Sequence, residues 1–430
     1  MPEIRPQHVL LQAGGEIAAR FGAFVIPGAG RQLIEEFKEA HTRASIATFQ
    51  NRDGRGQVAA VDKPRPHWIR NAGSGLFEPY WWLESLRAQL VPDPENFGAA
   101  GWTTVAGTGT RTGGQADPFG GTSAYLIADT DAANVFQIQE IVAFTGDGTK
   151  GVAIFVKAGS SGETNVRLRD TTAGADRFGV KVTWTAGVPT TAVIGGAGGA
   201  ILAVEPWGNG WYRILGNATG VVAANTNQFI LTPTNFTASS VADSYFFGAN
   251  AWNALYPSSY QGPTLATKQL ESVVLPFPYA PEALFVYMKF RERGNADGVG
   301  VSRLWRIGSN ADGLGTPALY VTYNTQYGTR LNVGGNITSG VIAGTPAYDD
   351  IVELLVTMAA NGLMQCTLAL NGGAPSVGTA AGAQTLPAAW SDANFYLAGM
   401  GAVLTPLARL IVGRSVQPSL ADVQSYIAAS

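Results

Sequence analysis

Side chains that could carry out catalysis are few and scattered in this sequence. The three histidines, His8, His41 and His67, show no metal-ligand spacing, which disfavours a His-based metal site or a catalytic triad. A retaining glycosidase needs two carboxylates roughly 5–5.5 Å apart, but Glu353 stands alone among apolar neighbours in residues 351–355. We therefore expect that the protein is not an enzyme.

The sequence also gives no sign of a phosphate-binding loop, a nucleic-acid interface or a membrane-spanning segment. The glycine-rich residues 113–114 and 195–199 lack the Lys-Ser or Lys-Thr that completes a phosphate loop. With 28 Lys and Arg against 31 Asp and Glu, the net charge of −3 gives no electrostatic footprint for nucleic acid. No apolar stretch approaches the roughly 18 residues that span a bilayer, and residues 1–5 lead into no signal-peptide core. We expect synthesis in a cytoplasm, no nucleic-acid partner and no membrane insertion.

Four aspartates are candidate calcium ligands, because carboxylate oxygens are what Ca²⁺ prefers and jelly-roll sandwiches often hold the ion at a sheet rim. They are Asp312, Asp349, Asp350 and Asp392. Solvated turn aspartates are the alternative interpretation. Calcium is thus the one cofactor that the sequence leaves open.

Aromatic side chains in predicted loops are candidates for glycan binding, because their faces match the apolar faces of pyranose rings. They are Trp81, Trp82, Trp252 and Tyr256. For Trp81 and Trp82 a domain or oligomer contact is an equal alternative, since aromatic residues are enriched in interface cores. Tryptophans within predicted strands are expected in the core: Trp184, Trp211 and Trp305.

The elements that must position these residues are mostly β-strands. Short alternating runs are separated by Gly, Asn, Asp and Pro, which is typical of sandwiches. Asp53-Gly54 predicts a hairpin between residues 45–49 and 57–61, since Asp-Gly tolerates positive φ. Further strands are predicted at 151–157, 178–184, 211–215, 228–231, 284–290, 318–323, 351–358, 365–370, 394–397 and 407–412. Helical periodicity is confined to residues 31–40 and 420–427. Cys366 alternates with Leu368, which predicts a buried, inert thiol.

The surface must be unusually poor in charge. Only 14% of the residues are charged, against roughly 25% in an average soluble protein. Gly numbers 54 and hydrophobic residues make up 46% of the chain. Such a surface is either covered by small polar residues or buried in an oligomer.

Residues 245–264 predict a closing strand that ends at Gly248, followed by a turn pinned by Pro257 and Pro263. This stretch resembles the ending of a jelly-roll module that recurs in bacteriophage tail and head-spike proteins. Other pieces between residues 44 and 264 match that module in order: 46–49, 53–54, 63–67, 75–78, 87–90, 95–97, Trp102, 152–159 and 207–213. Residues 80–85 are inserted relative to it. The resemblance implies a carbohydrate-binding-module-like jelly roll on a virion.

The remaining residues resemble a concanavalin-A-like (laminin-G-like) jelly roll. The matching stretches are 284–290, 303–308, 366–372, 394–399 and 408–413. The alternating run that ends in the Asn371-Gly372 turn is the most specific of them. The second half is therefore expected to form a second antiparallel sandwich.

Together these patterns predict an all-β protein of two tandem antiparallel jelly-roll sandwiches with a short helix-containing attachment segment. The predicted domains are 1–60 for attachment, 61–266 for the carbohydrate-binding-module-like jelly roll and 267–430 for the concanavalin-A-like jelly roll. The resemblance implies a structural phage protein on the virion surface, as a decoration, spike or fibre component. Its expected partners are other virion proteins and two further copies in a homotrimer. The alternative is a host-attachment adhesin that binds cell-surface glycan, and a depolymerase is third.

Overall fold

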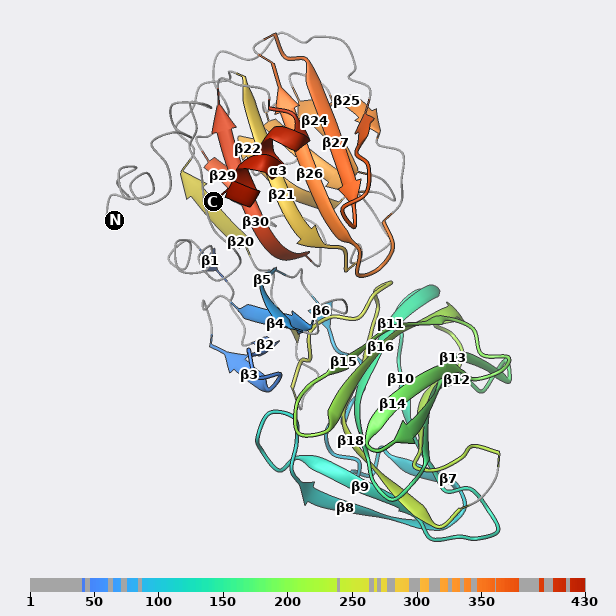
Figure 1. Ribbon diagram of the computed structural model, residues 1–430. Helices are drawn as coiled ribbons and strands as arrows, with labels where there is room; N and C mark the ends of the chain where they lie inside the picture. The colour runs from blue at the N-terminus through green and yellow to red at the C-terminus, as the bar shows by residue number, and fades with distance from the viewer. Residues whose placement is uncertain are drawn as a thin grey trace.

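The computed structural model describes residues 41–429, with gaps at 43–46, 61–64, 71–75, 84–86, 238–239, 263–266, 269–271, 277–282, 294–301, 309–317, 324–326, 333–335, 342–345, 360, 379–393, 398–404 and 415–417 (Figure 1). Nearly all of the regular structure in the described residues is β-strand, and the sheets are antiparallel. The predicted all-β class is confirmed. The helix predicted at residues 31–40 lies outside the described residues.

The first sandwich consists of two six-stranded sheets. One has the order β14 (Val188–Val193), β13 (Ala175–Thr185), β12 (Glu163–Asp170), β17 (Asn227–Thr232), β10 (Gln137–Val142), β7 (Thr103–Ala106). The other has the order β15 (Ala200–Pro206), β16 (Trp211–Val221), β11 (Gly148–Ala158), β18 (Ala242–Trp252), β9 (Ala124–Asp129), β8 (Gly109–Gln115). The chain crosses repeatedly between the two sheets, as in a jelly roll.

Apolar side chains from both of these sheets fill the space between them. Val166, Leu168 and Val180 come from one sheet, and Ile154 and Ile214 from the other. Each is less than 2% exposed, as alternation on facing strands predicts. A second, aromatic cluster forms at the side of the β11 sheet that faces away from this core: Phe119, Phe155, Trp207, Trp211, Phe247 and Tyr260.

Strand β18 does not end at Gly248, as the sequence predicted. The register with β11 shifts between Phe155↔Phe247 and Ala153↔Asn250, so the strand bulges and then continues to Trp252. Gly248 has φ +62°, and a Cβ there would lie 2.7 Å from the Tyr260 ring. Glycine is needed at such a bulge because it alone has no Cβ.

The second sandwich also consists of two sheets, each with seven strands. One has the order β1 (His41–Thr42), β20 (Ser272–Pro276), β29 (Asn394–Leu397), β22 (Ser302–Gly308), β23 (Ala318–Tyr323), β24 (Tyr327–Asn332), β25 (Asn336–Val341). The other has the order β28 (Ser376–Gly378), β27 (Met364–Leu370), β26 (Ile351–Met358), β21 (Leu284–Arg291), β30 (Thr405–Arg414), β5 (Phe77–Leu83), β4 (Pro66–Arg70). β24 and β25 approach β27, so the two sheets lie against each other.

Helix α3 (Leu420–Ala429) covers the outer face of the β21–β26 sheet (Figure 1). Its Leu420 and Val423 pack on Tyr287 and Leu355. Because both faces of this sheet are covered, β21 and β26 are buried along almost their whole length, which explains their continuous apolar sequence. Ser419 caps the helix: its Oγ accepts the Asp422 N–H at 3.1 Å, while its own N–H donates to that carboxylate at 2.9 Å.

The N-terminal strands contact both sandwiches, and three of them join sheets of the second. We call the described strands β1 to β5, between residues 41 and 83, the strap. The hairpin of β2 (Ala47–Gln50) and β3 (Gly56–Ala59) lies on the first sandwich, where the Gly56 N–H donates to the Pro118 carbonyl at 3.0 Å. By contrast, β1 pairs with β20, and β5 pairs with β30. In Figure 1 the blue strands of the strap lie between the two sandwiches.

This pairing differs from the predicted domain boundaries. Residues 66–83 were assigned to the first jelly roll, but β4 and β5 extend a sheet of the second sandwich. The stretch predicted as an insertion, 80–85, thus contains the part of β5 that reaches β30. The chain then passes into the first sandwich through β6 (Arg87–Ala88), which pairs with the returning segment β19 (Thr267–Lys268).

The other predicted strands that carry strong alternation are confirmed. Those at 318–323, 351–358 and 394–397 have the predicted bounds, and the hairpin around Asp53-Gly54 is present. Cys366 is buried, and burial raises the pKa of its thiol. Within the described ranges, no helix has the length and apolar character to cross a bilayer.

Candidate functional site at the junction of the two sandwiches

The densest group of buried charged and aromatic side chains lies where the two sandwiches and the strap meet. Arg293, directly after β21, is at its centre and is 1% exposed. Its Nη1 donates to Glu205 Oε1 of β15 at 2.8 Å. A residue of the second sandwich thereby forms a buried ion pair with a residue of the first.

A second carboxylate neutralises the arginines from within the second sandwich. Asp349 Oδ1 lies 2.9 Å from Arg293 Nη2, and its Oδ2 accepts a hydrogen bond from Arg291 at 3.2 Å. The Asp349 backbone has φ +75°, a left-handed conformation that Asp tolerates better than most residues. Two arginines therefore face two carboxylates, Glu205 and Asp349.

Tyr348 adds an aromatic contact across the junction. Its ring stacks on that of Tyr256 in the first sandwich, with the centroids 5.5 Å apart and an interplanar angle of 26°. It also packs against the cluster that contains Trp252 and Leu215. Its hydroxyl accepts a hydrogen bond from Arg293 at 3.1 Å, so the apolar and ionic contacts share one residue.

The strap contributes the third side of the junction. Tyr80 accepts a hydrogen bond from Arg291 Nε at 2.9 Å, and the Arg293 guanidinium lies 5.8 Å from the centre of the Trp82 ring. His67 of β4 packs on Trp82 at 4.4 Å and on Trp207 of the first sandwich at 6.1 Å. The β4–β5 hairpin is thus inserted between the sandwiches.

Burial sets the electrostatics of this site. Desolvation opposes the charged form of Arg293, but Tyr348, Asp349 and Glu205 outweigh it and raise the pKa of Arg293 above its usual value. Nearby Arg213 is buried too, and desolvation lowers its pKa to about 10 despite the charge of Glu205. Both arginines remain charged at neutral pH, so removal of Glu205 would leave two buried cations with less compensating negative charge.

This arrangement joins the two sandwiches and the strap through paired charges and packed rings. The two carboxylates of the ionic cluster are each engaged by an arginine. Among the residues that the structure describes, no group of three or more His, Cys, Asp or Glu side chains is placed to hold a metal ion. We call Arg291, Arg293, Glu205, Asp349 and Tyr348 the lock, because their contacts connect the two sandwiches.

Three of the four aromatic candidates for glycan binding lie at this junction. Two of them, Trp82 and Trp252, were predicted in loops but lie in buried strands. Trp82 lies in β5 and is 4% exposed, and Trp252 lies in β18 and is fully buried, with its indole N–H donating to Gln261 at 3.1 Å. Neither lies in a loop, and neither offers a free ring face to a sugar. Trp82 packs against His67 and Ala408 of its own sheet, below the Arg293 guanidinium. Tyr256 is half-buried and stacked, and of Trp81 only the backbone, in β5, is described.

The calcium interpretation is wrong for the two aspartates that can be judged. Asp349 is bound by two arginines, whose positive charge repels a cation. Asp350 caps a turn, accepting the Ala347 N–H at 2.7 Å and the Asn371 side-chain amide at 2.8 Å. Asp312 and Asp392 lie outside the described residues.

The central residues of the lock were not identified from the sequence. Arg291, Glu292 and Arg293 stand at the end of an apolar run, and Glu205 is the single charged residue in the otherwise apolar stretch 200–206. A weak signal existed, because three consecutive charges are rare in a chain with so little charge. Only the positions of the partners in space show that these residues are buried.

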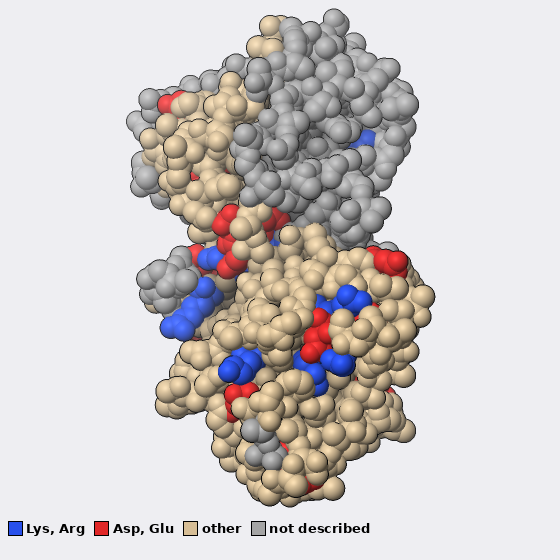
Figure 2. All heavy atoms as spheres, turned by 90° about the vertical axis from the view of Figure 1, so that its right-hand side faces the viewer, with Lys and Arg blue, Asp and Glu red and all other residues tan. Residues whose placement is uncertain are grey.

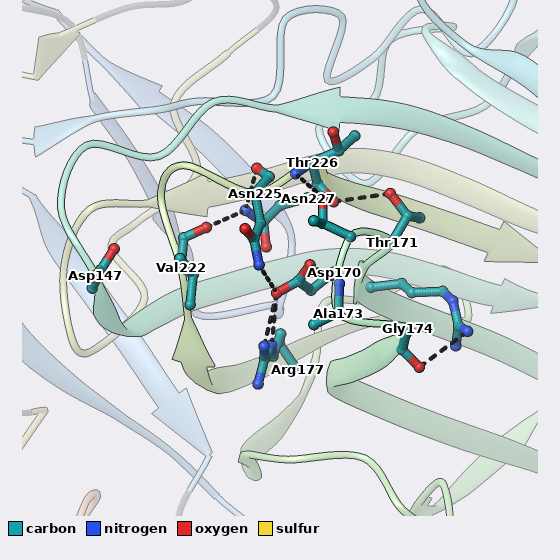
Figure 3. Close-up of polar contacts among 12 residues, drawn as sticks. Asp147, Asp170, Thr171, Ala173, Gly174, Arg177, Val222, Asn225, Thr226 and Asn227 are labelled. Atoms are coloured by element: carbon teal, nitrogen blue, oxygen red, sulfur yellow. Dashed lines mark hydrogen bonds and ion pairs between the residues drawn. The ribbon is translucent and has the colours of Figure 1, made fainter.

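A second polar cluster fixes two loops at one end of the first sandwich (Figure 3). Asp170, at the end of β12, is inaccessible to solvent. Its carboxylate accepts hydrogen bonds from Arg177 at 2.7 Å, from the Asn225 side chain at 2.9 Å and from the Ala173 N–H at 2.9 Å. Burial alone would raise the pKa of Asp170, but these donors and the charge of Arg177 hold it at about 2.

Glu140 of β10 is another buried acid, and its pKa is shifted in the opposite direction to that of Asp170. It is 2% exposed, and its Oε2 accepts only the weak Asp93 N–H bond at 3.2 Å. Burial, reinforced by the charge of Asp93, raises the pKa of Glu140 to about 7. Near neutral pH this side chain is therefore divided between its neutral and charged forms.

Comparison with known proteins adds no relative: no protein-family model and no curated protein matches this sequence.

Proposed function

We propose that this chain is a structural component of a bacteriophage particle, displayed on the virion surface as a decoration, spike or fibre protein. The observation that carries the proposal is the lock around Arg293, which joins both sandwiches and the strap through buried contacts. A protein that projects from a particle has to transmit force without bending between its domains. The resemblance of residues 44–264 to a phage jelly-roll module supports the same proposal.

The surface composition supports assembly with other copies. Over the described residues, the face in Figure 2 is mostly free of Lys, Arg, Asp and Glu, and the charged atoms form a few small groups of both signs. Such a surface can be covered by a neighbouring subunit at a low cost in charge desolvation. We include a homotrimer in the proposal, and light scattering of the purified protein would measure its mass.

The experiment that tests the proposal locates the chain on purified particles. An epitope tag would be inserted at the Ala186-Gly187 turn, where both residues are exposed. We expect the tagged chain to copurify with particles at a fixed copy number and gold-labelled antibody to decorate one position on them. Absence of the chain from intact particles would overturn the proposal.

A matched deletion tests the attachment segment. Removing residues 1–40, which precede the described strap, is expected to leave the melting temperature nearly unchanged and to abolish incorporation into particles. The tagged full-length chain is the control for folding and expression. Incorporation that survives this deletion would contradict attachment through the N-terminal segment.

A further inference from the structure

The strap completes sheets whose other strands come from the last third of the chain. β1 pairs with β20, and β5 pairs with β30 through Leu83↔Thr405, Trp82↔Pro406 and Trp81↔Leu407. Without the strap, the edges of β20 and β30 would be unpaired. Unpaired strand edges readily pair with another segment of chain.

The second sandwich offers more than a bare strand edge. Tyr80 and Trp82, both 4% exposed, pack in a cluster with Ile69 and with Ala408 of β30. Arg291 and Arg293 stand over the rings of Tyr80 and Trp82, at 5.3 and 5.8 Å from their centres. The hydrogen bond from Arg291 Nε to the Tyr80 hydroxyl fixes the position of that ring along the strand.

These features are those of a recognition site for a β-hairpin. Main-chain pairing at a sheet edge supplies affinity, and pockets for alternate side chains supply specificity. Here the alternate side chains are the Tyr80 and Trp82 pair, two residues apart on β5, and the pockets are formed by β30 and the end of β21.

We infer that the edge of β30, together with Arg291 and Arg293, is a binding site for the β4–β5 hairpin and holds it without need of the covalent connection between β5 and β6. The second sandwich is then not an independent module beginning at residue 267. It is a receptor that is complete only with residues 66–83 bound. The N-terminal segment is anchored on the second sandwich directly, in addition to its contacts with the first.

The test uses the full-length protein with a protease site inserted between Leu83 and Arg87 and an affinity tag at the N-terminus. After cleavage, we expect the N-terminal piece to remain bound to the rest of the chain at micromolar concentration in native buffer. The Tyr80→Ala/Trp82→Ala double variant is expected to weaken this binding at least tenfold, the effect of removing buried aromatic anchors. Separation of the wild-type pieces on cleavage would overturn the inference.

Two further variants distinguish recognition by the second sandwich from general loss of folding. Leu76→Ala, at a residue of the same segment that is 68% exposed, is expected to leave binding unchanged. Tyr80→Phe keeps the ring and removes only the hydroxyl that Arg291 binds, and is expected to weaken binding by about two- to tenfold. Circular dichroism and trypsin resistance of each uncleaved variant establish that it folds. If folded Tyr80→Ala/Trp82→Ala binds as tightly as Leu76→Ala, the strap is held by its other contacts, including β1 on β20, and the inference fails.

Discussion

Arg293 Nη1 and Glu205 Oε1 lie 2.8 Å apart and belong to different sandwiches. Both side chains are largely shielded from water, and Asp349 lies on the other side of the same guanidinium. The free energy of this pair therefore depends on the two sandwiches keeping their relative position. If the sandwiches separated, this hydrogen-bonded pair would be lost, and Arg293 would keep Asp349 as its counter-ion.

Arg293→Ala is expected to lower the free energy of unfolding by about 3 kcal/mol, because it leaves Glu205 buried without its cation. Urea unfolding followed by tryptophan fluorescence measures the change. The control is Arg169→Ala, which removes a 34% exposed arginine from its ion pair with Asp176 at 3.0 Å, while Asp176 keeps Arg167 as a partner. Loss of this partly exposed pair is expected to cost less than about 1 kcal/mol. Equal effects of the two substitutions would show that the junction pair has no special stabilising role.

Asp170→Asn is expected to destabilise the first sandwich at neutral pH by about 1–3 kcal/mol, since Arg177 loses its counter-ion and buried hydrogen bonds are weakened. The folded-state pKa of Asp170, about 2, lies below the usual aspartate value of 3.8. The contribution of the carboxylate is therefore complete above pH 3.8 and is lost as the pH falls towards 2. Denaturant unfolding of both proteins at pH 7 and pH 3 should show the difference between them shrinking at the lower pH. A difference that does not depend on pH would contradict this assignment.

Glu140→Gln is expected to have the opposite pH dependence. The folded-state pKa of Glu140, about 7, lies above the usual glutamate value of 4.5, so the folded protein favours the protonated form. The stability associated with that form is present below pH 4.5 and is lost as the pH rises through 7. The glutamine variant should therefore gain stability relative to the wild type as the pH rises, by at most about 3 kcal/mol. Melting temperatures measured from pH 4 to pH 8 check the trend, and parallel curves for the two proteins would refute it.

Gly248→Ala should be more destabilising than Gly262→Ala, although the two glycines have nearly the same backbone conformation, with φ +62° and +61°. Both substitutions introduce strain of about 1 kcal/mol from positive φ. Only at Gly248 does the new Cβ meet a neighbour, the Tyr260 ring at 2.7 Å, whereas nothing lies within 4 Å at Gly262. We expect Gly248→Ala to cost a further 1 kcal/mol or more, on the order of an overpacked core. Chemical denaturation of the two variants isolates this contact.

Local sequence patterns were sufficient for the class and for many individual strands. The run at 351–358 and the Asp53-Gly54 hairpin were predicted because alternation, apolar content and turn chemistry act between neighbouring residues. Helix α3 was predicted for the same reason, from the spacing of Leu420, Val423 and Ile427. In each case the information lies within about ten positions of the sequence.

The membership of strands in sheets could not be predicted in this way. β5 pairs with β30, on the far side of the whole first sandwich in sequence, and no local pattern in residues 77–83 identifies that partner. Trp252 was placed in a loop because a glycine interrupts its strand, yet the bulge lets the strand continue. Arg293 resembles a solvated arginine in sequence, and its burial depends on Glu205 and Asp349, which come from two other segments.

The pairing of β5 with β30 also determines when the second sandwich can complete its folding during translation. The β4–β5 hairpin leaves the ribosome early, whereas Thr405 to Leu407, its partners in β30, are made near the end. At roughly 5–20 residues per second, the hairpin waits on the order of tens of seconds for that strand. The first sandwich can fold meanwhile, but the nascent chain carries an unpaired hairpin with two exposed aromatic rings until translation is nearly complete. Crowded polysomes that make this protein are thus the place where a hairpin from one chain can meet the β30 edge of another.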